Sequence, residues 1–322
     1  MGERIVITGA AGFIASHLAD ELVARGHRVL GIDNLLTGSL ANLDGAVAAG
    51  MPFIEADVID EWPAIDAAIA DELKGVDLVL HLASPASPVA YANHSLATLR
   101  ANSVGTENAA RCALRHGARF LFASTSESYG DPIQHPQREE YWGNVNPVGV
   151  RACYDEGKRY GEALVSTMVR VAGLDGRIVR IFNTYGPRMR SDDGRVVPNF
   201  ISRAIAGNPL TIYGDGSQTR SFCFVDDLVE GIVRVAASPE ARGRVVNLGN
   251  PAECTIRALA EIVARLVGSD LNIEYKELPT DDPTRRCPDI SLAWKLMSWA
   301  PQVELEDGLR RTIALSLRRR SG

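Results

Sequence analysis

Residues 124–130 read STSESYG and place five hydroxyl groups and one carboxylate directly after the apolar run FLFA at 120–123. Polar groups that follow a buried strand are typically aimed at a ligand, because parallel sheets bind ligands at the carboxyl ends of their strands. Glu127 is the only acid in the stretch, and we interpret it as part of a site. The alternative is that Glu127 caps a helix or forms a surface ion pair.

Tyr154 and Lys158 stand four residues apart in ACYDEGKRY, so on a helix they share one face. A free phenol has a pKa of about 10, and a nearby ammonium stabilises the phenolate and lowers that pKa. Such a tyrosine could take a hydroxyl proton while the carbon beneath it gives hydride to a nicotinamide. Alone, this spacing is equally typical of a solvated helix face, and its meaning comes from its position after a nucleotide-binding half.

The nucleotide-binding pattern is TGAAGFIA at 8–15, in which Gly9 and Gly12 separate a predicted strand from a predicted helix. Glycines there allow a tight turn and a close approach to a pyrophosphate, and the helix N-terminus offers free N–H groups. The next predicted strand ends in Asp33, whose carboxylate could bind the ribose hydroxyls. Asn34 follows it, rather than the Arg or Lys that suits a 2′-phosphate, so the pattern favours NAD over NADP. Asp33 could instead cap a helix or a turn.

Short apolar runs alternate with amphipathic stretches in the first half, which predicts a parallel sheet covered on both faces. The predicted strands are 4–8, 28–32, 52–55, 77–82, 119–123 and 177–182, and the helices include 12–25, 95–116 and 152–172. Beyond residue 183, Pro, Gly and Asn become frequent, and short helices are predicted at 197–206, 226–237 and 255–267. We predict an α/β fold, with a Rossmann-like doubly wound NAD-binding domain (1–182) and a smaller mixed α/β lobe (183–322). Some crossing of the chain between the two is expected.

Composition excludes several classes of function. The chain has 322 residues, a formal net charge of −6 and no basic face of the kind that nucleic-acid binders carry; the basic run at 318–320 is interpreted as the solvated end of a last helix. No apolar stretch approaches a membrane span, and a core strand begins at residue 4, so we expect neither a membrane partner nor a signal peptide. The five cysteines match no metal pattern and suit a reducing compartment. We expect a cytoplasmic protein without a metal site.

The glycine pattern TGAAGFIA (8–15), with STSESYG and the Tyr154–Lys158 pair, resembles the extended short-chain dehydrogenase/reductase family. Eight stretches resemble, within it, the UDP-glucuronate decarboxylases: HLASPASP (81–88), ASTSESYGDP (123–132), HPQ (135–137), YWGNVNPVGVRACYDEGKR (141–159), RIFNTYGPRM (180–189), DGRVVPNFI (193–201), YGDGSQTRSF (213–222) and DDPTRRCPDI (281–290). The resemblance implies NAD as cofactor and UDP-glucuronate as substrate. The sugar would be oxidised at C4, lose carbon dioxide, be protonated at C5 and regain hydride at C4, which gives UDP-xylose and regenerates NAD. Ala15 and Ser128 depart from the family, which has a glycine and usually a valine there.

The resemblance also implies roles for particular residues. Thr125 would order the 4-hydroxyl near Tyr154, Ser126 would contact the sugar, and Glu127 would favour departure of the carboxylate. Arg220 would organise the carboxylate and the C5 protonation, and Lys158 completes the catalytic set. The expected cofactor-binding residues are Gly9, Gly12, Phe13, Ile14, Asp33, Asn34, Asp57, Val58, Leu82, Ala83, Ser84, Asn102, Ser124, Tyr154 and Lys158. The expected substrate-binding residues are Pro85, Ser87, Tyr91, Asn183, Arg188, Val197, Tyr213, Gln218, Arg220, Arg286 and Asp289.

Related activities remain as alternatives. A 4,6-dehydratase of this family has Thr-Asp-Glu where this chain has Thr125-Ser126-Glu127, so the acid for a leaving hydroxyl is missing. A UDP-glucuronate 4-epimerase, or another UDP-sugar epimerase, needs the same oxidation at C4 and stays open. A non-catalytic NAD-binding scaffold would need only the nucleotide end. Family members commonly form homodimers through two helices of each subunit, which correspond here to 95–116 and 152–172.

Overall fold

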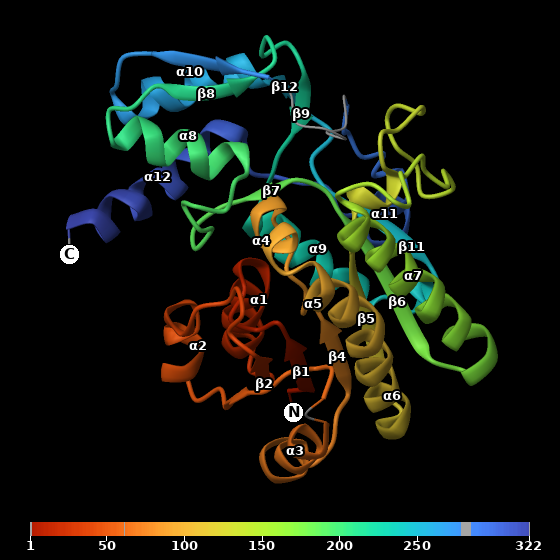
Figure 1. Ribbon diagram of the computed structural model, residues 1–322. Coiled ribbons are helices and arrows are strands. Elements are labelled where there is room, and N and C mark those ends of the chain that lie inside the picture. Colours follow the sequence, from red (N-terminus) through yellow and green to blue (C-terminus); the bar gives the residue numbers. More distant parts are fainter. Residues whose placement is uncertain (1, 61, 278–284, 322) are drawn as a thin grey trace.

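The structure is a computed structural model that describes residues 2–60, 62–277 and 285–321 (Figure 1). A helix-covered sheet forms the larger part, and a smaller lobe lies against one end of it. The N-terminus belongs to the sheet, whereas the last helix, α12 (Leu305–Ser321), runs along the smaller lobe.

Seven parallel strands form the central sheet in the order β11-β6-β5-β4-β1-β2-β3. Their bounds are β1 (Arg4–Thr8), β2 (Arg28–Asp33), β3 (Phe53–Glu55), β4 (Leu78–His81), β5 (Arg119–Thr125), β6 (Asp175–Ile181) and β11 (Val245–Leu248). Most of them are runs of Val, Ile and Leu, because helices bury both faces of the sheet. The winding direction reverses between β1 and β4, and sheets of this type bind ligands at the carboxyl ends of the strands at such a switch point.

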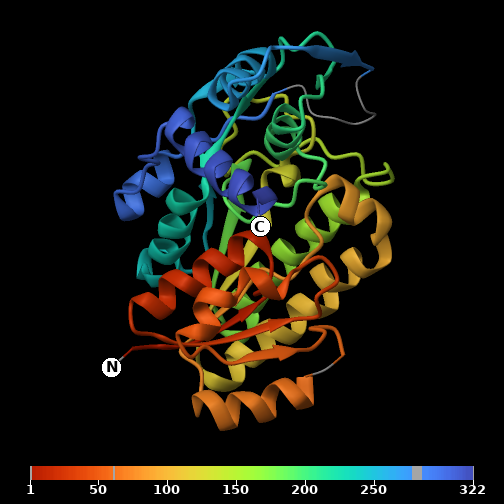
Figure 2. The ribbon, with the colours of Figure 1, turned by 90° about the vertical axis from the view of Figure 1, so that its left-hand side faces the viewer.

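Helices cover both faces of the sheet, as Figure 2 shows. The alternation of side chains along β1 assigns them to two layers: Ile5 and Ile7 pack with α1 and α9, whereas Val6 packs with α3, α6 and α7 on the other face. The helices of these two layers are α1 (Phe13–Ala24), α2 (Asp44–Ala48), α3 (Trp62–Ala68), α5 (Ser95–Arg100), α6 (Thr106–His116), α7 (Ala152–Ala172) and α9 (Val225–Ala237).

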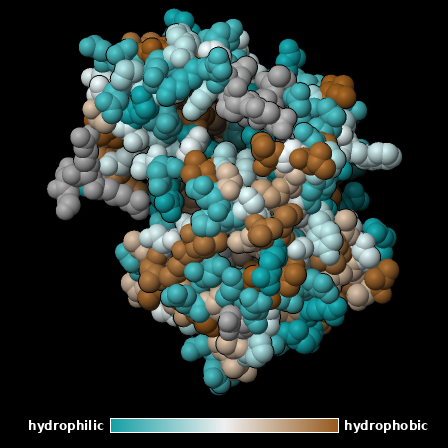
Figure 3. Space-filling model, in the orientation of Figure 1, coloured by the Kyte–Doolittle hydropathy of each residue, from teal (hydrophilic) through white to brown (hydrophobic). Residues whose placement is uncertain are grey.

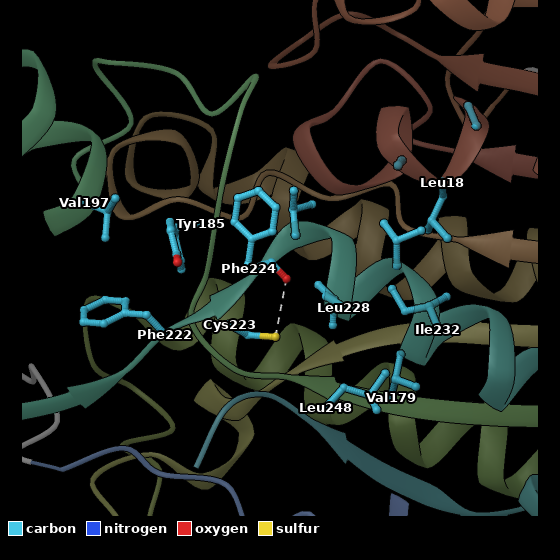
Figure 4. Packing of buried hydrophobic residues seen from close by; sticks show 14 of the residues in the cluster. Leu18, Val179, Tyr185, Val197, Phe222, Cys223, Phe224, Leu228, Ile232 and Leu248 are labelled. Carbon is cyan, nitrogen blue, oxygen red and sulfur yellow. Dashed lines mark hydrogen bonds between the residues drawn. The ribbon is translucent and has the colours of Figure 1, made fainter. Parts of the chain in front are cut away.

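The smaller lobe contains three two-stranded pairs, β7–β10, β9–β12 and β8–β13. Its elements are β7 (Thr184–Tyr185), α8 (Val196–Ile205), β8 (Leu210–Tyr213), β9 (Thr219–Ser221), β10 (Cys223–Phe224), β12 (Glu253–Thr255), α10 (Ile256–Val267), β13 (Ile273–Lys276), α11 (Ser291–Met297) and α12. Tyr185, Phe222 and Phe224 pack in one continuous cluster with Val179 and Leu248 of the main sheet (Figure 4). This shared core fixes the lobe against the sheet.

The predicted doubly wound parallel sheet is confirmed, and two details differ from expectation. The single helix predicted over 95–116 is α5, a π-helical segment (Ala101–Gly105) and α6. The extra residue in such a turn often marks a functional position, and Asn102 lies in it. In addition, β11 and α9 come from the second half of the chain yet build the sheet layer. The domain boundary at 182/183 stays a prediction.

Two expectations concern the ends and the surface. None of the helices in the described ranges has both the length and the apolar composition that crossing a bilayer requires. The basic run at 318–320 begins at Arg318 in α12, where it is exposed. The side chains at 319 and 320 lie outside the described part of the molecule, as do residues 281–284 of the DDPTRRCPDI stretch.

Candidate active site

The turn between β1 and α1 is built by backbone contacts that require glycine. The amides of Gly9 and Ala10 both donate to the Ile32 carbonyl, at 2.8 and 3.1 Å, and Gly9 has a φ of +73°. A Cβ at Gly9 would lie 2.8 Å from the Cα of Ala83, at the end of β4. Only glycine therefore lets this turn lie against the end of the neighbouring strand.

Asp33 fixes the same turn from the end of β2. Its Oδ2 accepts from the amide of Ala11 at 3.0 Å, and its Oδ1 accepts from the amide of Leu35 at 2.8 Å. Burial raises the pKa of this carboxyl, although the two amides oppose the shift. Asp33 therefore does act as a turn residue, which was the alternative to ligand binding. The two roles are compatible, because the Asp33 carboxylate also lines a pocket.

That pocket, here called the glycine-turn pocket, opens at the carboxyl ends of β1, β2 and β4. It is lined by Gly9, Asp33, Asn34, Leu36, Thr37, Ala56, Asp57, Val58, Ile59, Ala83, Ser84, Pro85, Ala97 and Ala101. Asn34 donates from Nδ2 to Oδ2 of Asp57 at 2.8 Å, which joins the ends of two strands. The pocket brings together eight of the expected residues. Phe13, Ile14 and Leu82 are instead partly buried against the core.

Buried polar side chains continue from the pocket toward the middle of the sheet. Asn102 donates from Nδ2 to Ser84 Oγ at 2.9 Å, and its Oδ1 is buried without a partner among the described residues. Next to it, His81 Nδ1 lies 2.7 Å from Thr8 Oγ1. Burial, assisted by the charge of Lys158, lowers the pKa of His81 to about 3, so this ring is neutral. The role of His81 as a buried polar bridge was not anticipated from the sequence.

Tyr154 and Lys158 share one face of α7, as their spacing predicts. Nζ of Lys158 donates to the Ala123 carbonyl at 2.7 Å and lies 5.9 Å from the centre of the Tyr154 ring. The ring of Tyr91, in α4 (Pro88–Asn93), stacks on Tyr154 with the centroids 5.1 Å apart. Tyr91 from the 84–91 loop therefore reaches the tyrosine, and Ser87 caps α4 by accepting from the Ala90 amide.

The expected lowering of the Tyr154 pKa is wrong for this chain by itself. Burial raises the pKa of Tyr154 to about 12, and a hydrogen bond with Thr125 opposes the shift only in part. Burial also lowers the pKa of Lys158 to about 7, because keeping the ammonium charged in the interior costs free energy. Removal from water penalises both the phenolate of Tyr154 and the ammonium of Lys158. In both groups this penalty outweighs the mutual stabilisation that their spacing in the sequence suggests.

Glu127 lies between two arginines from distant parts of the chain. Its Oε2 accepts from Arg151 at 2.5 Å and its Oε1 accepts from Arg286 at 2.7 Å. Burial alone would raise the pKa of this carboxyl, but the two guanidinium groups outweigh it and hold the pKa at about 2. All three side chains are largely buried. These residues, the Glu127 cluster, are not the surface ion pair of the alternative, and the cap of the following turn is Thr125.

A second buried network lies beneath the strand end. Ser124 donates to Glu162 at 2.5 Å, and Glu162 accepts two hydrogen bonds from Arg180, at 2.9 and 2.7 Å. Ser128 joins it through a 3.3 Å contact between its Oγ and that of Ser124. The departure from valine at 128 thus adds a polar group that the network satisfies.

The expected substrate residues divide into separate groups. Asn183 lies near the cluster, with its Oδ1 3.5 Å from Nη1 of Arg286. Arg188 pairs with Asp20 of α1, and Arg188 and Val197 line another pocket, between α8 and α12 within the lobe. Gln218 donates to the Tyr213 carbonyl, and Asp289 accepts from the amide of Ser291 at the start of α11.

The two arginines on Glu127 include one residue that sequence reasoning missed. Arg151 precedes α7 by one residue, and the signal that could have found it is its place one helical turn before Asp155 and three residues before Tyr154. Burial and the charge of Glu127 raise the pKa of Asp155 to about 7. Arg220, which was expected to organise the substrate carboxylate, lies on β9 and donates to the Thr219 carbonyl. The guanidinium that contacts Glu127 from the lobe belongs to Arg286.

Comparison with known protein families identifies the family of the chain. The sequence model of the NAD dependent epimerase/dehydratase family matches residues 5–249, which are more than half of the chain. The chain belongs to this family. The matched residues include the glycine turn and Glu127, whereas Arg286 lies beyond them.

Individual relatives extend the comparison. UDP-glucuronic acid decarboxylase 2 of Arabidopsis thaliana is 50% identical over 309 residues, which are 96% of this chain and 67% of that protein. UDP-glucuronic acid decarboxylase 1 of Xenopus tropicalis is 47% identical over 312 residues, which are 97% of this chain and 71% of that protein. Among solved structures, UDP-glucose 4-epimerase with UDP-glucose from Thermotoga maritima superposes with a TM-score of 0.90, at 27% identity and covering 99% of this chain and 100% of that one.

The glycine-turn pocket fits the dinucleotide of the NAD dependent epimerase/dehydratase family. A side chain at Gly9 would collide with the backbone of Ala83, so glycine keeps the turn close to the end of β4. The start of α1 offers free amides to a pyrophosphate at this turn. The carboxylate of Asp33 would hold the ribose. The buried, unpartnered Oδ1 of Asn102 is an acceptor between the pocket and Lys158. NAD is the cofactor of this family, and the polar groups from Asp33 to Lys158 are the ones that could hold it.

Proposed function

We propose that the chain is an NAD-dependent UDP-glucuronate decarboxylase that forms UDP-xylose. The observation that carries the proposal is Arg286: it is buried on Glu127, and its Nη2 has no hydrogen-bond partner among the described residues. A buried guanidinium nitrogen requires an acceptor, and a carboxylate matches its planar pair of donors. Relatives named as UDP-glucuronic acid decarboxylases, at 50% and 47% identity over nearly the whole chain, support the same reaction.

NAD, when bound, would supply the hydride chemistry at C4 of the sugar. Tyr154 takes the proton of the 4-hydroxyl, and Thr125, which hydrogen-bonds to Tyr154, orders that hydroxyl. Lys158, fixed on the Ala123 carbonyl, orients the tyrosine side of the site. A ketone at C4 lies β to the C6 carboxylate, so carbon dioxide departs into an enolate that the new carbonyl stabilises.

Arg286 and Glu127 act on the departing carboxylate. Arg286 binds it through the unpartnered nitrogen, which places the negative charge of Glu127 close by. Because the pKa of Glu127 is held at about 2, it stays ionised throughout the neutral range. A fixed negative charge beside a carboxylate favours the loss of that carboxylate as neutral carbon dioxide. On this proposal Arg286, rather than Arg220, organises the carboxylate.

A UDP-sugar 4-epimerase is the second candidate, and the TM-score of 0.90 to a UDP-glucose 4-epimerase favours it. Both reactions need the same proton transfer by Tyr154, so the geometry at C4 does not separate them. They differ in what happens to the ketone: the decarboxylase breaks the bond between C5 and C6, whereas the epimerase turns the sugar and reduces its other face.

Nuclear magnetic resonance of the sugar nucleotide tests the two candidates directly. The purified protein is incubated with NAD and UDP-glucuronate, and released carbon dioxide is measured in parallel. A UDP-pentose formed in step with carbon dioxide supports the decarboxylase. UDP-galacturonate without carbon dioxide supports the epimerase and overturns the first proposal.

We also propose that the chain forms a homodimer through α5 and α7, which pack side by side. Leu96 and Leu99 of α5 and Tyr160 of α7 are 77%, 38% and 50% exposed. Figure 3 shows hydrophobic side chains gathered over the middle of the molecule, around α4 and α5. Light scattering should give twice the mass of one chain, and Leu96→Glu should halve it, whereas Leu271→Glu in the lobe should not. A wild-type mass of one chain would contradict the dimer.

We further propose a cytoplasmic location, because all five cysteines are free thiols and a reducing compartment keeps them so. Fractionation of the cells that produce the protein, followed by immunodetection, would test it. Recovery outside the cytoplasmic fraction would contradict the proposal.

A further inference from the structure

Three side chains with metal-binding atoms meet at the edge of the lobe. They are His135, Glu253 and Cys287, and their ligand atoms all lie within 4.8 Å of one another. His135 lies in the loop that follows β5. Glu253 is the first residue of β12, and Cys287 lies shortly before α11. No spacing in the sequence predicts this meeting, because the three residues lie on three separate segments of the chain.

The surrounding contacts orient these ligand atoms. Nε2 of His135 lies 3.0 Å from Oε2 of Glu253, and Oε1 of Glu253 accepts from Thr219 Oγ1 at 2.6 Å. The Cys287 thiol contacts the Pro251 carbonyl at 3.4 Å. Partners of this kind hold the ligands of metal sites in place. His135 and Glu253 are partly exposed, which leaves a path for an ion from solvent.

We propose that His135, Glu253 and Cys287 form a binding site for a borderline divalent cation such as Zn²⁺. Imidazole, thiolate and carboxylate are the ligands that Zn²⁺ takes, and three of them with an open fourth position for water make a tetrahedral site. Sulfur and nitrogen ligands disfavour Mg²⁺ and Ca²⁺. Tetrahedral bonds of about 2.0–2.3 Å require ligand atoms roughly 3.3–3.8 Å apart, so the exposed His135 and Glu253 side chains must draw in toward Cys287. On binding, the thiol proton of Cys287 leaves to solvent.

The position of the site gives the ion a consequence for the Glu127 cluster. The amide of Cys287 donates to Oε1 of Gln137 at 2.8 Å, and the amide of Gln137 donates to the Cys287 carbonyl at 2.9 Å. Cys287 directly follows Arg286, so an ion on its sulfur fastens the segment that carries Arg286 to β12 and to the loop after β5. This inference does not depend on the identity of the sugar substrate.

Titration of the metal-free full chain with Co²⁺ tests the site, because a cobalt–thiolate bond gives a charge-transfer band in the near ultraviolet. One equivalent should produce the band in the wild type and in Cys254→Ser, and none in Cys287→Ser. Cys254 is the matched control, since it is adjacent to Glu253 on a strand and points to the opposite face. The band should persist in excess Mg²⁺ and disappear on addition of Zn²⁺.

His135→Gln gives an independent test, because this side chain is partly exposed and its replacement leaves the core intact. It should lower the Co²⁺ affinity by more than the roughly 10–100-fold that loss of an outer-shell partner costs. Zn²⁺ should raise the melting temperature of the wild type and not that of His135→Gln. The proposal fails if the wild type gives no band, if Cys287→Ser keeps it, or if Mg²⁺ displaces the ion.

Discussion

The glycine-turn pocket and the Glu127 cluster lie at the same edge of one sheet, but different interactions build them. At the pocket, the backbone amides of Ala11 and Leu35 hold the carboxylate of Asp33. At the cluster, two guanidinium groups hold the carboxylate of Glu127. Burial dominates at Asp33 and raises its pKa, whereas the arginines dominate at Glu127 and lower it. The glycine-turn pocket is a cavity built by the backbone that can accept a ligand. The Glu127 cluster is a set of charged side chains that can act on a bound ligand.

Tyr154→Phe should have the largest effect, which is on turnover. It should leave the structures of the pocket and of the cluster unchanged. The ring keeps its stack on Tyr91 and its burial, while the proton-transferring oxygen is lost. We expect turnover to fall by about 10²–10⁴-fold, measured as product formation, with NAD affinity and melting temperature close to those of the wild type. Near-normal turnover would mean that another group takes the proton.

Glu127→Gln should show that the cluster depends on charge for its stability. Removing one partner of a buried ion pair costs about 3–5 kcal/mol, which urea unfolding measures. Glu107→Gln, which breaks an exposed pair with Arg111 on α6, is the control and should cost about 0.5 kcal/mol or less. Equal costs for the two would contradict the contrast.

The contribution of Glu127 should also depend on pH with a definite sign. Its folded pKa of about 2 lies below its ordinary value of 4.5, so the stabilisation is complete above about pH 4.5. It is lost as the pH falls toward 2, because protonation then removes the charge that the arginines bind. The difference in unfolding free energy between wild type and Glu127→Gln should therefore shrink only below pH 4.5.

Lys158→Met should lower activity by less than Tyr154→Phe does, and it should stabilise the fold. The pKa of Lys158 is lowered from 10.5 to about 7, so burying its ammonium is penalised fully below pH 7 and not at all above pH 10.5. One pKa unit is worth about 1.4 kcal/mol, and the lost hydrogen bond to Ala123 offsets part of the gain. We expect a gain of roughly 2 kcal/mol at pH 7 and little at pH 10, from melting curves. Lys295→Met on exposed α11 should show no such difference; a gain independent of pH would be a packing effect.

Asp33→Asn should have the smallest effect, because backbone contacts build most of the pocket. The amide nitrogen that replaces Oδ2 cannot accept from Ala11, so one charge-assisted hydrogen bond is lost. We expect NAD affinity to fall about tenfold, which corresponds to about 1.4 kcal/mol, by isothermal titration calorimetry. Unchanged affinity would show that the turn holds its shape without the carboxylate.

The same contrast explains what could be predicted from the sequence. The pocket follows from the glycine turn and the strand end at Asp33, which lie close in the chain and carry their geometry in local backbone rules. The sequence likewise predicted that Tyr154 and Lys158 are neighbours on one face of a helix. It could not predict the direction of their pKa shifts, because these depend on burial by elements distant in the chain.

The cluster was out of reach for another reason. Arg151 and Arg286 are separated from Glu127 by 24 and 159 residues, so only the folded chain shows that they meet. Helix periodicity predicted 95–116 as one helix and did not reveal the π-helical segment. The extra residue shifts the apolar pattern by one position, which is hard to recognise over the six residues of α5.

The pairing of Gln137 with the segment around Cys287 and Pro288 has a consequence for how the protein is made. The dinucleotide pocket is complete once its last wall, near residue 101, has left the ribosome. The carboxylate at 127 meets its second arginine only after residue 286 has been translated, 159 residues later. A nascent chain would therefore contain every residue that lines the glycine-turn pocket well before it contains both arginines of the Glu127 cluster.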